Sequence, residues 1–225
     1  MRLALLALVA AIASPALSAE RTFSVGAFEE IVLAGSMDVT VTTGRDVSVI
    51  AEGSAAALDR LDIRTDGNKL MIGHKRGTQG SWSESSPTVR VTVPRVSAAT
   101  ISGSGDMVID KVDAPAFTGR ISGSGDLVIG NLRAGPVELS TSGSGDMRAA
   151  GRCTALSTRI SGSGDMMLGG LTCETVDATV NGSGNITVNA TKSGNLATNG
   201  SGDIKVSGGA KCSIRKSGSG SIVCG

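Results

Sequence analysis

The chain has 225 residues, with 21 Lys and Arg against 20 Asp and Glu, and a formal net charge of +1. A chain so close to neutral lacks the basic surface that nucleic acid and anionic membranes attract, so we exclude both as partners. Only 2% of the residues are aromatic and there is no tyrosine, which weighs against a strong lectin site and against one dominant hot spot for a protein partner.

Residues 1–19 have the features of an export signal peptide. Arg2 supplies the positive start, residues 3–12 form an apolar centre, and residues 14–19 are a small-residue cleavage region. Cleavage before Ala19 and cleavage before Glu20 both fit this pattern. The apolar run is too short to span a bilayer. We therefore expect a soluble, exported mature chain of about 206 residues, either periplasmic or extracellular.

Residues 20–100 are irregular, and we interpret them as an N-terminal cap that includes degenerate coils. Residues 31–41 contain an imperfect copy of a phrase that recurs later in the chain, with Met37 in place of its second glycine. The local predictions are strands at 47–51 and 88–93, one or two helical turns at 55–61, and a hairpin at Asp66–Gly67.

Residues 101–225 carry a six-residue phrase that occurs seven times and reads Ser-Gly-Ser-Gly-Asp-Met in its first copy. The copies start at Ser102, Ser122, Ser142, Ser161, Asn181, Asn199 and Ser217, so the steps between them are 20, 20, 19, 20, 18 and 18 residues. A nearly constant period of this length is the signature of stacked structural repeats, each of which contacts only its neighbours.

Apolar residues recur at every second position on both sides of each Gly-rich corner, as Ile101, Met107 and Ile109 do around the first copy. This period is typical of strands, and a coil of 18–20 residues at about 3.3 Å per residue is long enough to close one turn around a narrow core. We therefore predict an all-β fold: a single-stranded β-helix, or solenoid, of about seven coils with an irregular N-terminal cap. Residues 20–100 and 101–225 form one continuous domain in this prediction.

The four cysteines fit two disulfide bonds. Cys153 and Cys173 each lie eight residues before the next phrase, so they share a column on adjacent coils, and Cys212 and Cys224 flank the last corner. Stacked coils lie about 4.8 Å apart, which is within the Cα separation that a disulfide accepts. Because the chain has one histidine and no CxxC motif, bridges are favoured over a metal site. We predict the pairs Cys153–Cys173 and Cys212–Cys224.

An acidic residue occupies the fifth phrase position in most copies, at Asp106, Asp126, Asp146 and Asp165. Carboxylates about 5 Å apart repel each other, so such a column requires solvation, hydrogen bonds from backbone N–H groups of the turn, or bridging cations. Turn capping is the first interpretation and a calcium ladder is the second. We retain the four aspartates as candidate binding residues.

Nothing in the sequence assembles a catalytic site. His74 is the only histidine, and the Gly-Ser-Gly motif lacks the strand-to-helix context of a hydrolase nucleophile. The recurring aspartate marks a structural unit, whereas a catalytic residue occurs once. We predict a non-enzyme with no cofactor and no metal.

Trp82 is the one exposed-loop aromatic candidate, because it lies in the polar segment 77–86. It either folds back over the core or contacts a partner. A second interpretation of the whole chain follows from its neighbours His74, Lys75 and Arg76: a carbohydrate-active or cation-binding β-helix with its site in the irregular N-terminal half.

The chain resembles the exported bacterial family described as putative auto-transporter adhesin, head GIN domain. The resemblance rests on residues 28–39, on Leu58–Leu61 together with the Asp66–Gly67 hairpin, and on Thr88–Pro94 followed by Ile101–Asp106. It implies a β-helix similar to pectin-lyase-like proteins but without their catalytic residues, and a role in adhesion. We expect a binding module for an unidentified envelope or surface ligand, either a glycan or a protein.

Overall fold

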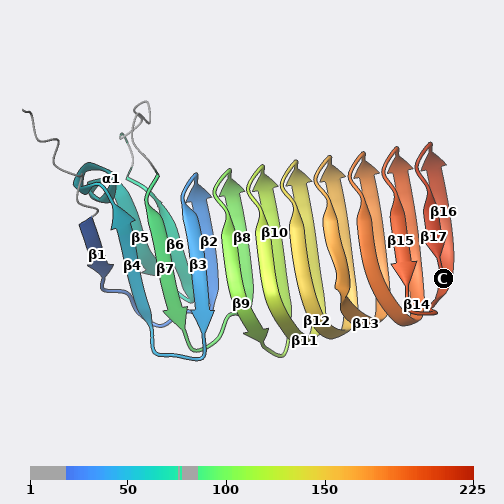
Figure 1. The fold of residues 1–225 in the computed structure, drawn as a ribbon, viewed down its shortest axis with the longest axis horizontal. Helices are drawn as coiled ribbons and strands as arrows, with labels where there is room; N and C mark the ends of the chain where they lie inside the picture. The colour runs from blue at the N-terminus through green and yellow to red at the C-terminus, as the bar shows by residue number, and fades with distance from the viewer. Residues whose placement is uncertain (1–18, 76, 78–85) are drawn as a thin grey trace, which may run out of the picture.

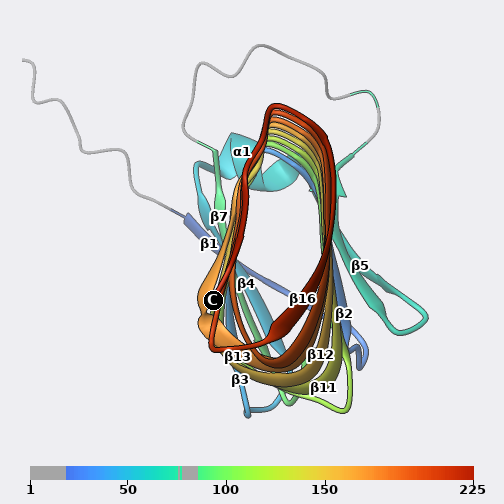
Figure 2. The same cartoon turned by 90° about the vertical axis from the view of Figure 1, so that its right-hand side faces the viewer.

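The computed structural model describes residues 19–75, 77 and 86–225, and they form a β-solenoid whose coils lie side by side along one axis (Figure 1). Viewed along that axis, the coils superpose as a narrow closed outline (Figure 2). The N-terminal part contains β1 (Ala19–Phe23), β2 (Glu30–Gly35), β3 (Asp38–Thr43), β4 (Ser48–Gly53), α1 (Ala55–Asp59), β5 (Leu61–Asp66), β6 (Lys69–His74) and β7 (Thr88–Val93). The repeat part contains β8 (Ala98–Gly103), β9 (Met107–Asp113), β10 (Phe117–Gly123), β11 (Leu127–Gly143), β12 (Met147–Gly162), β13 (Met166–Gly182), β14 (Ile186–Gly200), β15 (Ile204–Ser207), β16 (Lys211–Gly218) and β17 (Ile222–Cys224).

The repeated phrase forms one corner of every coil, which we call the glycine corner (residues 102–107 and their six later copies). The copies stack in parallel and in register, with Ser122 opposite Ser102 on one side and Ser142 on the other. This register continues along the repeat to the last copy, where Asn199 lies opposite Ser217. The predicted period of 18–20 residues is therefore the circumference of one coil.

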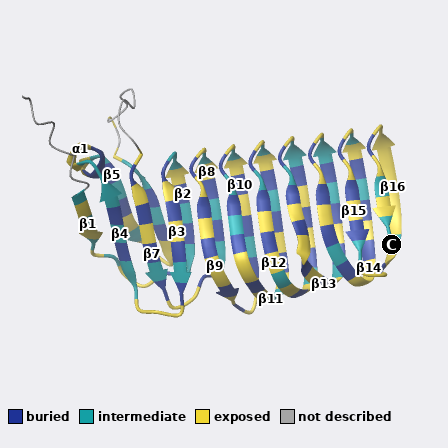
Figure 3. Ribbon diagram, viewed as in Figure 1, coloured by how far each residue is buried: buried dark blue, intermediate teal, exposed yellow. Residues whose placement is uncertain are grey.

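Alternation of buried and exposed residues builds the core of the solenoid. Ile101, Met107 and Ile109 are fully buried, and Val108 between the last two is exposed. Because the coils are in register, the buried positions form columns across the strands (Figure 3), and these columns are apolar apart from buried threonines such as Thr141 and Thr198. The sequence pattern of apolar residues at every second position thus corresponds to one closed core.

The two glycines of each corner are required by close packing of the coils. The first glycine of the seven copies has φ between +114° and +144°, a region that L side chains rarely adopt. A Cβ on the second glycine, for example on Gly125 or Gly145, would overlap the backbone carbonyl oxygen of the equivalent glycine one coil away. In the seven copies of the phrase, both positions therefore exclude a side chain.

The coil order in the N-terminal part does not follow the chain. The coil formed by β2 and β3 stacks between the β6–β7 coil and the β8–β9 coil, with Gly35 opposite Gly103. The imperfect phrase is thus a true glycine corner, and Met37 lies directly against Gly105. After β3 the described chain forms β4, α1, β5, β6 and β7 on one side of this coil, and β8 pairs with its other side.

The cap ends the parallel stack with antiparallel strands. β4 pairs antiparallel with β7 and with β1, and β5 forms an antiparallel hairpin with β6 at the predicted Asp66–Gly67 turn. α1 connects β4 to β5 and begins after Ser54, whose side chain accepts a hydrogen bond from Ala57 N. The β5–β6 hairpin stands out from the side of the solenoid (Figure 2). In the part of the chain that the structure describes, no helix has the length and apolarity needed to cross a bilayer.

The far corner, opposite the glycine corner, is less regular. It comprises residues 110–116, 130–136, 150–155, 169–175, 189–193 and 207–211. The pairing register shifts there between Ile129 and Leu132, between Arg148 and Ala150, and on both sides of Thr172–Cys173. The far corner therefore absorbs the one- or two-residue differences in coil length.

Candidate functional site

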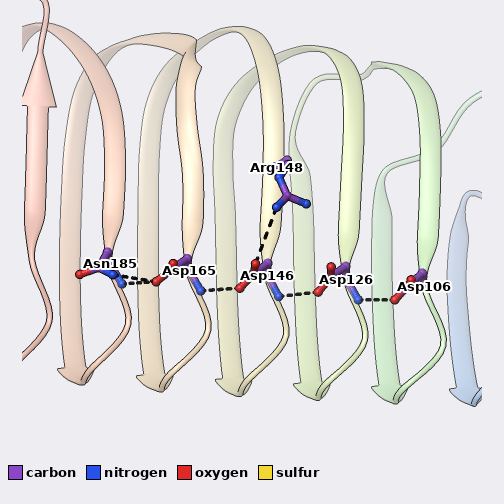
Figure 4. A network of polar contacts seen from close by, with 6 residues as sticks. All are labelled: Asp106, Asp126, Asp146, Arg148, Asp165 and Asn185. Atoms are coloured by element: carbon purple, nitrogen blue, oxygen red, sulfur yellow. Dashed lines mark hydrogen bonds and ion pairs between the residues drawn. The ribbon is translucent and has the colours of Figure 1, made fainter.

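The candidate aspartates form a hydrogen-bonded column along the glycine corners, which we call the aspartate ladder (Asp106, Asp126, Asp146, Asp165, Asn185 and Asp203). The Oδ1 atom of each member accepts a hydrogen bond from the backbone N–H of the equivalent residue one coil further on (Figure 4). The donor–acceptor distances are 2.8 Å from Asp126 N to Asp106, 2.8 Å from Asp146 N to Asp126 and 2.8 Å from Asp165 N to Asp146.

A second hydrogen bond at each step runs in the opposite direction. Met107 N donates to Asp126 O at 2.8 Å, and Leu127 N donates to Asp146 O at 2.9 Å. One side-chain and one backbone hydrogen bond thus join adjacent corners at the aspartate, and Ser124 N and Gly125 N also donate to Gly103 O. A carboxylate that accepts an N–H is stabilised in its charged form, and this offsets the repulsion between neighbours. The structure therefore shows turn capping as one role of the ladder.

The ladder continues beyond the four candidate residues with side chains that keep the same acceptor geometry. Asn185 accepts from Asp203 N at 3.0 Å, and Asp203 accepts from Ser221 N at 2.7 Å. At the other end, Asp38 accepts from Asp106 N at 3.3 Å. An amide oxygen is sufficient for this contact, so the shared requirement is an acceptor on a short side chain.

The outer side of the ladder is open to solvent. Asp106 is exposed, Asp126, Asp146 and Asp165 are half-buried, and the Arg148 guanidinium lies 3.8 Å from Asp146 Oδ2 (Figure 4). Among the residues that the structure describes, no group of three or more His, Cys, Asp or Glu side chains is arranged to hold a metal ion. The role of these aspartates in binding a ligand stays a prediction.

Both predicted disulfide bonds are present. Cys153 and Cys173 face each other on adjacent coils at the far corner, with a Cα–Cα distance of 4.5 Å, and Ala134 occupies the same column one coil earlier. Cys212 and Cys224 join the two sides of the last coil with a Cα–Cα distance of 6.3 Å. The Cys153–Cys173 bond braces the far corner, and the Cys212–Cys224 bond closes the last coil by joining β16 to β17.

The residues of the second interpretation do not share one described site. Trp82 and Arg76 lie outside the described residues. His74 ends β6 and packs against Gly35, and burial lowers the pKa of its imidazole. Lys75 follows it, and its ammonium donates to Asp59 O at 2.8 Å. The described members therefore lie at the cap end of the glycine corners.

A half-open hollow of about 570 Å³ lies instead at the far corner of the N-terminal half. Its walls include Phe28, Asn68, Arg95 and Lys111. The Glu29 carboxylate accepts a hydrogen bond from Arg95 and raises the pKa of that guanidinium. No sequence pattern groups these residues, because they come from separate segments that only the displaced order of the coils brings together.

Several comparisons place this architecture among known proteins. The family model described as putative auto-transporter adhesin, head GIN domain, matches residues 27–210. A crystal structure of a putative adhesin from Bacteroides fragilis NCTC 9343 superposes with a TM-score of 0.85 at 23% identity, covering 92% of this chain and 96% of that one.

Two structures from Parabacteroides distasonis ATCC 8503 are also similar. A putative adhesin has a TM-score of 0.74 at 22% identity, covering 92% of this chain and 96% of that one. A putative lipid binding protein has a TM-score of 0.73 at 20% identity, covering 91% and 95%. A search of curated proteins finds no match.

At these identities the solved structures establish the shared fold, and they carry no ligand over to this chain. The family match covers most of the chain, including the cap, the imperfect corner and the copies of the phrase up to Asp203. Membership of an adhesin family and two disulfide bonds together indicate an exported protein. The chain belongs to the family described as putative auto-transporter adhesin, head GIN domain.

Proposed function

We propose that this protein is a non-catalytic binding module that attaches to a glycan or protein ligand of the cell envelope or the extracellular surface. One observation carries the proposal: polar side chains stand in a straight, in-register line beside the glycine corners. The line consists of Ser102, Ser122, Ser142, Ser161, Asn181, Asn199 and Ser217.

Such a face suits the binding of an extended ligand. Hydroxyl and amide groups donate and accept hydrogen bonds, and the coil spacing repeats them about every 4.8 Å. Individual contacts of this kind are weak, but several along one ligand reinforce each other. A rigid solenoid also holds its side chains in place before binding, which reduces the entropic cost of association.

The aspartate ladder supports the non-catalytic part of the proposal. Each Oδ1 accepts a backbone N–H, so the carboxylates serve the same structural purpose in successive coils. In this proposal the segment 1–19 is a signal peptide that directs the chain to the periplasm or beyond it.

Co-sedimentation of the mature protein with isolated envelope fractions tests the proposal. Retention on one fraction, and its loss when that fraction is first saturated with unlabelled protein, is the expected result. Absence of the protein from every pellet would contradict an envelope ligand. The same experiment with calcium and with a chelator separates capping from cation binding, since only a ladder that holds calcium makes retention calcium-dependent.

A second candidate function is a carbohydrate-active or cation-binding site in the N-terminal half, and the hollow beside Arg95 and Lys111 favours its carbohydrate-active form. Deleting residues 77–86 removes the segment that carries Trp82 and none of the residues that line the hollow, while Lys111→Ala alters the hollow alone. The main proposal predicts that neither variant loses envelope binding. Loss of binding in either variant favours the second candidate.

A further inference from the structure

A hollow of about 350 Å³ lies on the face formed by the strands that lead into the glycine corners. Three residues of β10, β11 and β12 define it: Arg120 lies opposite Ser140, and Ser140 lies opposite Arg159. These strands run side by side in the middle of the solenoid (Figure 1). Because the short Ser140 separates two long side chains, the surface is recessed between two arginines whose backbones are two coil spacings, about 9.6 Å, apart.

The two arginines differ in their partners. Arg120 Nη2 lies 2.8 Å from Glu138 Oε1, which fixes its side chain along the neighbouring coil. Asp177 lies at the position relative to Arg159 that Glu138 has relative to Arg120, and the side chain of Asp177 is one methylene shorter than that of Glu138. Among residues 19–75, 77 and 86–225, no carboxylate forms an ion pair with Arg159. Its exposed positive charge is therefore available to a ligand.

Hydroxyl groups border the hollow on the side of the glycine corners. Ser122, Ser142 and Ser161 line it in register, and Thr100 lines its end. Ser122 and Ser142 are exposed, so their hydroxyls are free to donate to or accept from a neutral polar ligand. Most of the accessible surface inside the hollow is apolar, and the residues that border it carry two guanidinium groups and a row of hydroxyls.

We propose that this hollow binds the carboxylate-bearing sugars of an acidic polysaccharide that runs across the coils. The inference rests on the proposed binding function and names its ligand class. Guanidinium groups bind carboxylates through two parallel hydrogen bonds, and the serine hydroxyls match the hydroxyls of the sugar ring. With no aromatic residue lining the hollow, binding is weak per sugar and depends on ligand length and on ionic strength.

Calorimetry or affinity electrophoresis with alginate oligosaccharides tests the proposal in a buffer that contains chelator. The ligand control is the same oligosaccharides after chemical reduction of their carboxyl groups. Arg159→Ala is expected to lower the affinity roughly tenfold, the usual effect of losing a charge-assisted hydrogen bond. Arg120→Ala is expected to lower it less, because the Arg120 guanidinium is already paired with Glu138. Arg215→Ala removes the same charge from the same column three coils away, and with oligosaccharides too short to reach it the affinity is expected to stay within about twofold.

Absence of alginate binding, equal binding of the reduced oligosaccharides, or an unchanged affinity in Arg159→Ala would overturn the proposal. Envelope co-sedimentation of the same variants distinguishes failure of the acidic-polysaccharide proposal from failure of the proposed envelope-binding function. If Arg159→Ala is retained like the wild type, the module binds the envelope through another surface and only this inference fails. If the wild type is not retained and does not bind alginate, both fail.

Discussion

The glycine corner and the far corner both reverse the direction of the chain within each coil, but they differ in sequence and in register. At the glycine corner, two glycine columns and the aspartate ladder repeat without a change of register from Gly103 to Gly218. At the far corner, the residues vary, the register shifts and the Cys153–Cys173 disulfide bond joins adjacent coils. This fold therefore needs one invariant corner to set the register, and the other corner is then free to vary in length and sequence.

The largest expected loss of stability comes from adding a side chain to a glycine of the glycine corner. Gly145→Ala places a Cβ against the carbonyl oxygen of Gly125, and neither backbone can move without breaking the stack. We expect a loss of about 3–5 kcal/mol in the free energy of unfolding, the range of the most severe single substitutions. Urea denaturation followed by circular dichroism measures it.

Gly169→Ala is the matched control for this substitution. A Cβ at Gly169, at the start of the far corner, meets only the Thr187 side chain at an ordinary distance of 3.4 Å. We expect a change within about 0.5 kcal/mol, as for other surface positions. Equal destabilisation by the two substitutions would refute the distinction between the corners.

The next effect concerns the brace of the far corner. Replacing both Cys153 and Cys173 with alanine, the residue at position 134 of the same column, removes the bond without a steric conflict. The bond closes a sequence separation of 20 residues, so we expect a loss of about 3 kcal/mol. A reductant should lower the melting temperature of the wild type by reducing both disulfide bonds. It should lower that of the variant less, because only Cys212–Cys224 remains to be reduced. Identical stability of the two proteins without reductant would contradict a bracing role.

A smaller effect is expected in the aspartate ladder. Asp126→Ala leaves Asp146 N without its acceptor, and we expect a loss of about 1–2 kcal/mol. Asp126→Asn keeps an acceptor oxygen, as Asn185 does for Asp203 N, and should stay within about 0.5 kcal/mol of the wild type. Chemical denaturation compares the pair. If Asp126→Asn is as unstable as Asp126→Ala, the negative charge matters and the capping account is incomplete.

The smallest effect is a pH dependence at the cap end of the glycine corners. Burial lowers the pKa of His74 below its ordinary value of 6.5, so the unfolded state binds a proton more readily than the native state. The stabilising contribution is complete above about pH 6.5 and is lost as the pH falls towards the lowered pKa. NMR titration of this only histidine measures the pKa directly, and His74→Gln should flatten the dependence. A measured His74 pKa at or above 6.5 would contradict the claim that burial destabilises the charged imidazole.

Much of the fold was predictable because its determinants are local and repeated. The period gave the coil circumference, the apolar alternation gave the core, and equal offsets from the phrase paired Cys153 with Cys173. The Asp66–Gly67 turn was likewise readable from two residues. Each of these features depends on neighbours in sequence or on an identical position one period away.

The order of the first coils was not predictable in the same way. The placement of β2 and β3 between later strands depends on long-range pairing, and no residue between positions 44 and 97 signals it. Residues 34–39 are an imperfect copy of the phrase, and the alignment of Gly35 with Gly103 and of Met37 with Gly105 was the available clue. The hollow at Ser140 was also not predicted from the sequence. Its residues come from neighbouring coils, and which outward side chains lie next to each other is known only from the register between those coils.

Native-state hydrogen exchange tests most directly the claim that the glycine corner fixes the register of the solenoid. The amides of Asp126, Asp146 and Asp165, which donate to the ladder, report on the glycine corner, and the far-corner amides report on the other side. We predict that the ladder amides exchange only through global unfolding, whereas far-corner amides open locally at lower free energy. Ladder amides that exchange as fast as those of the far corner would contradict the account.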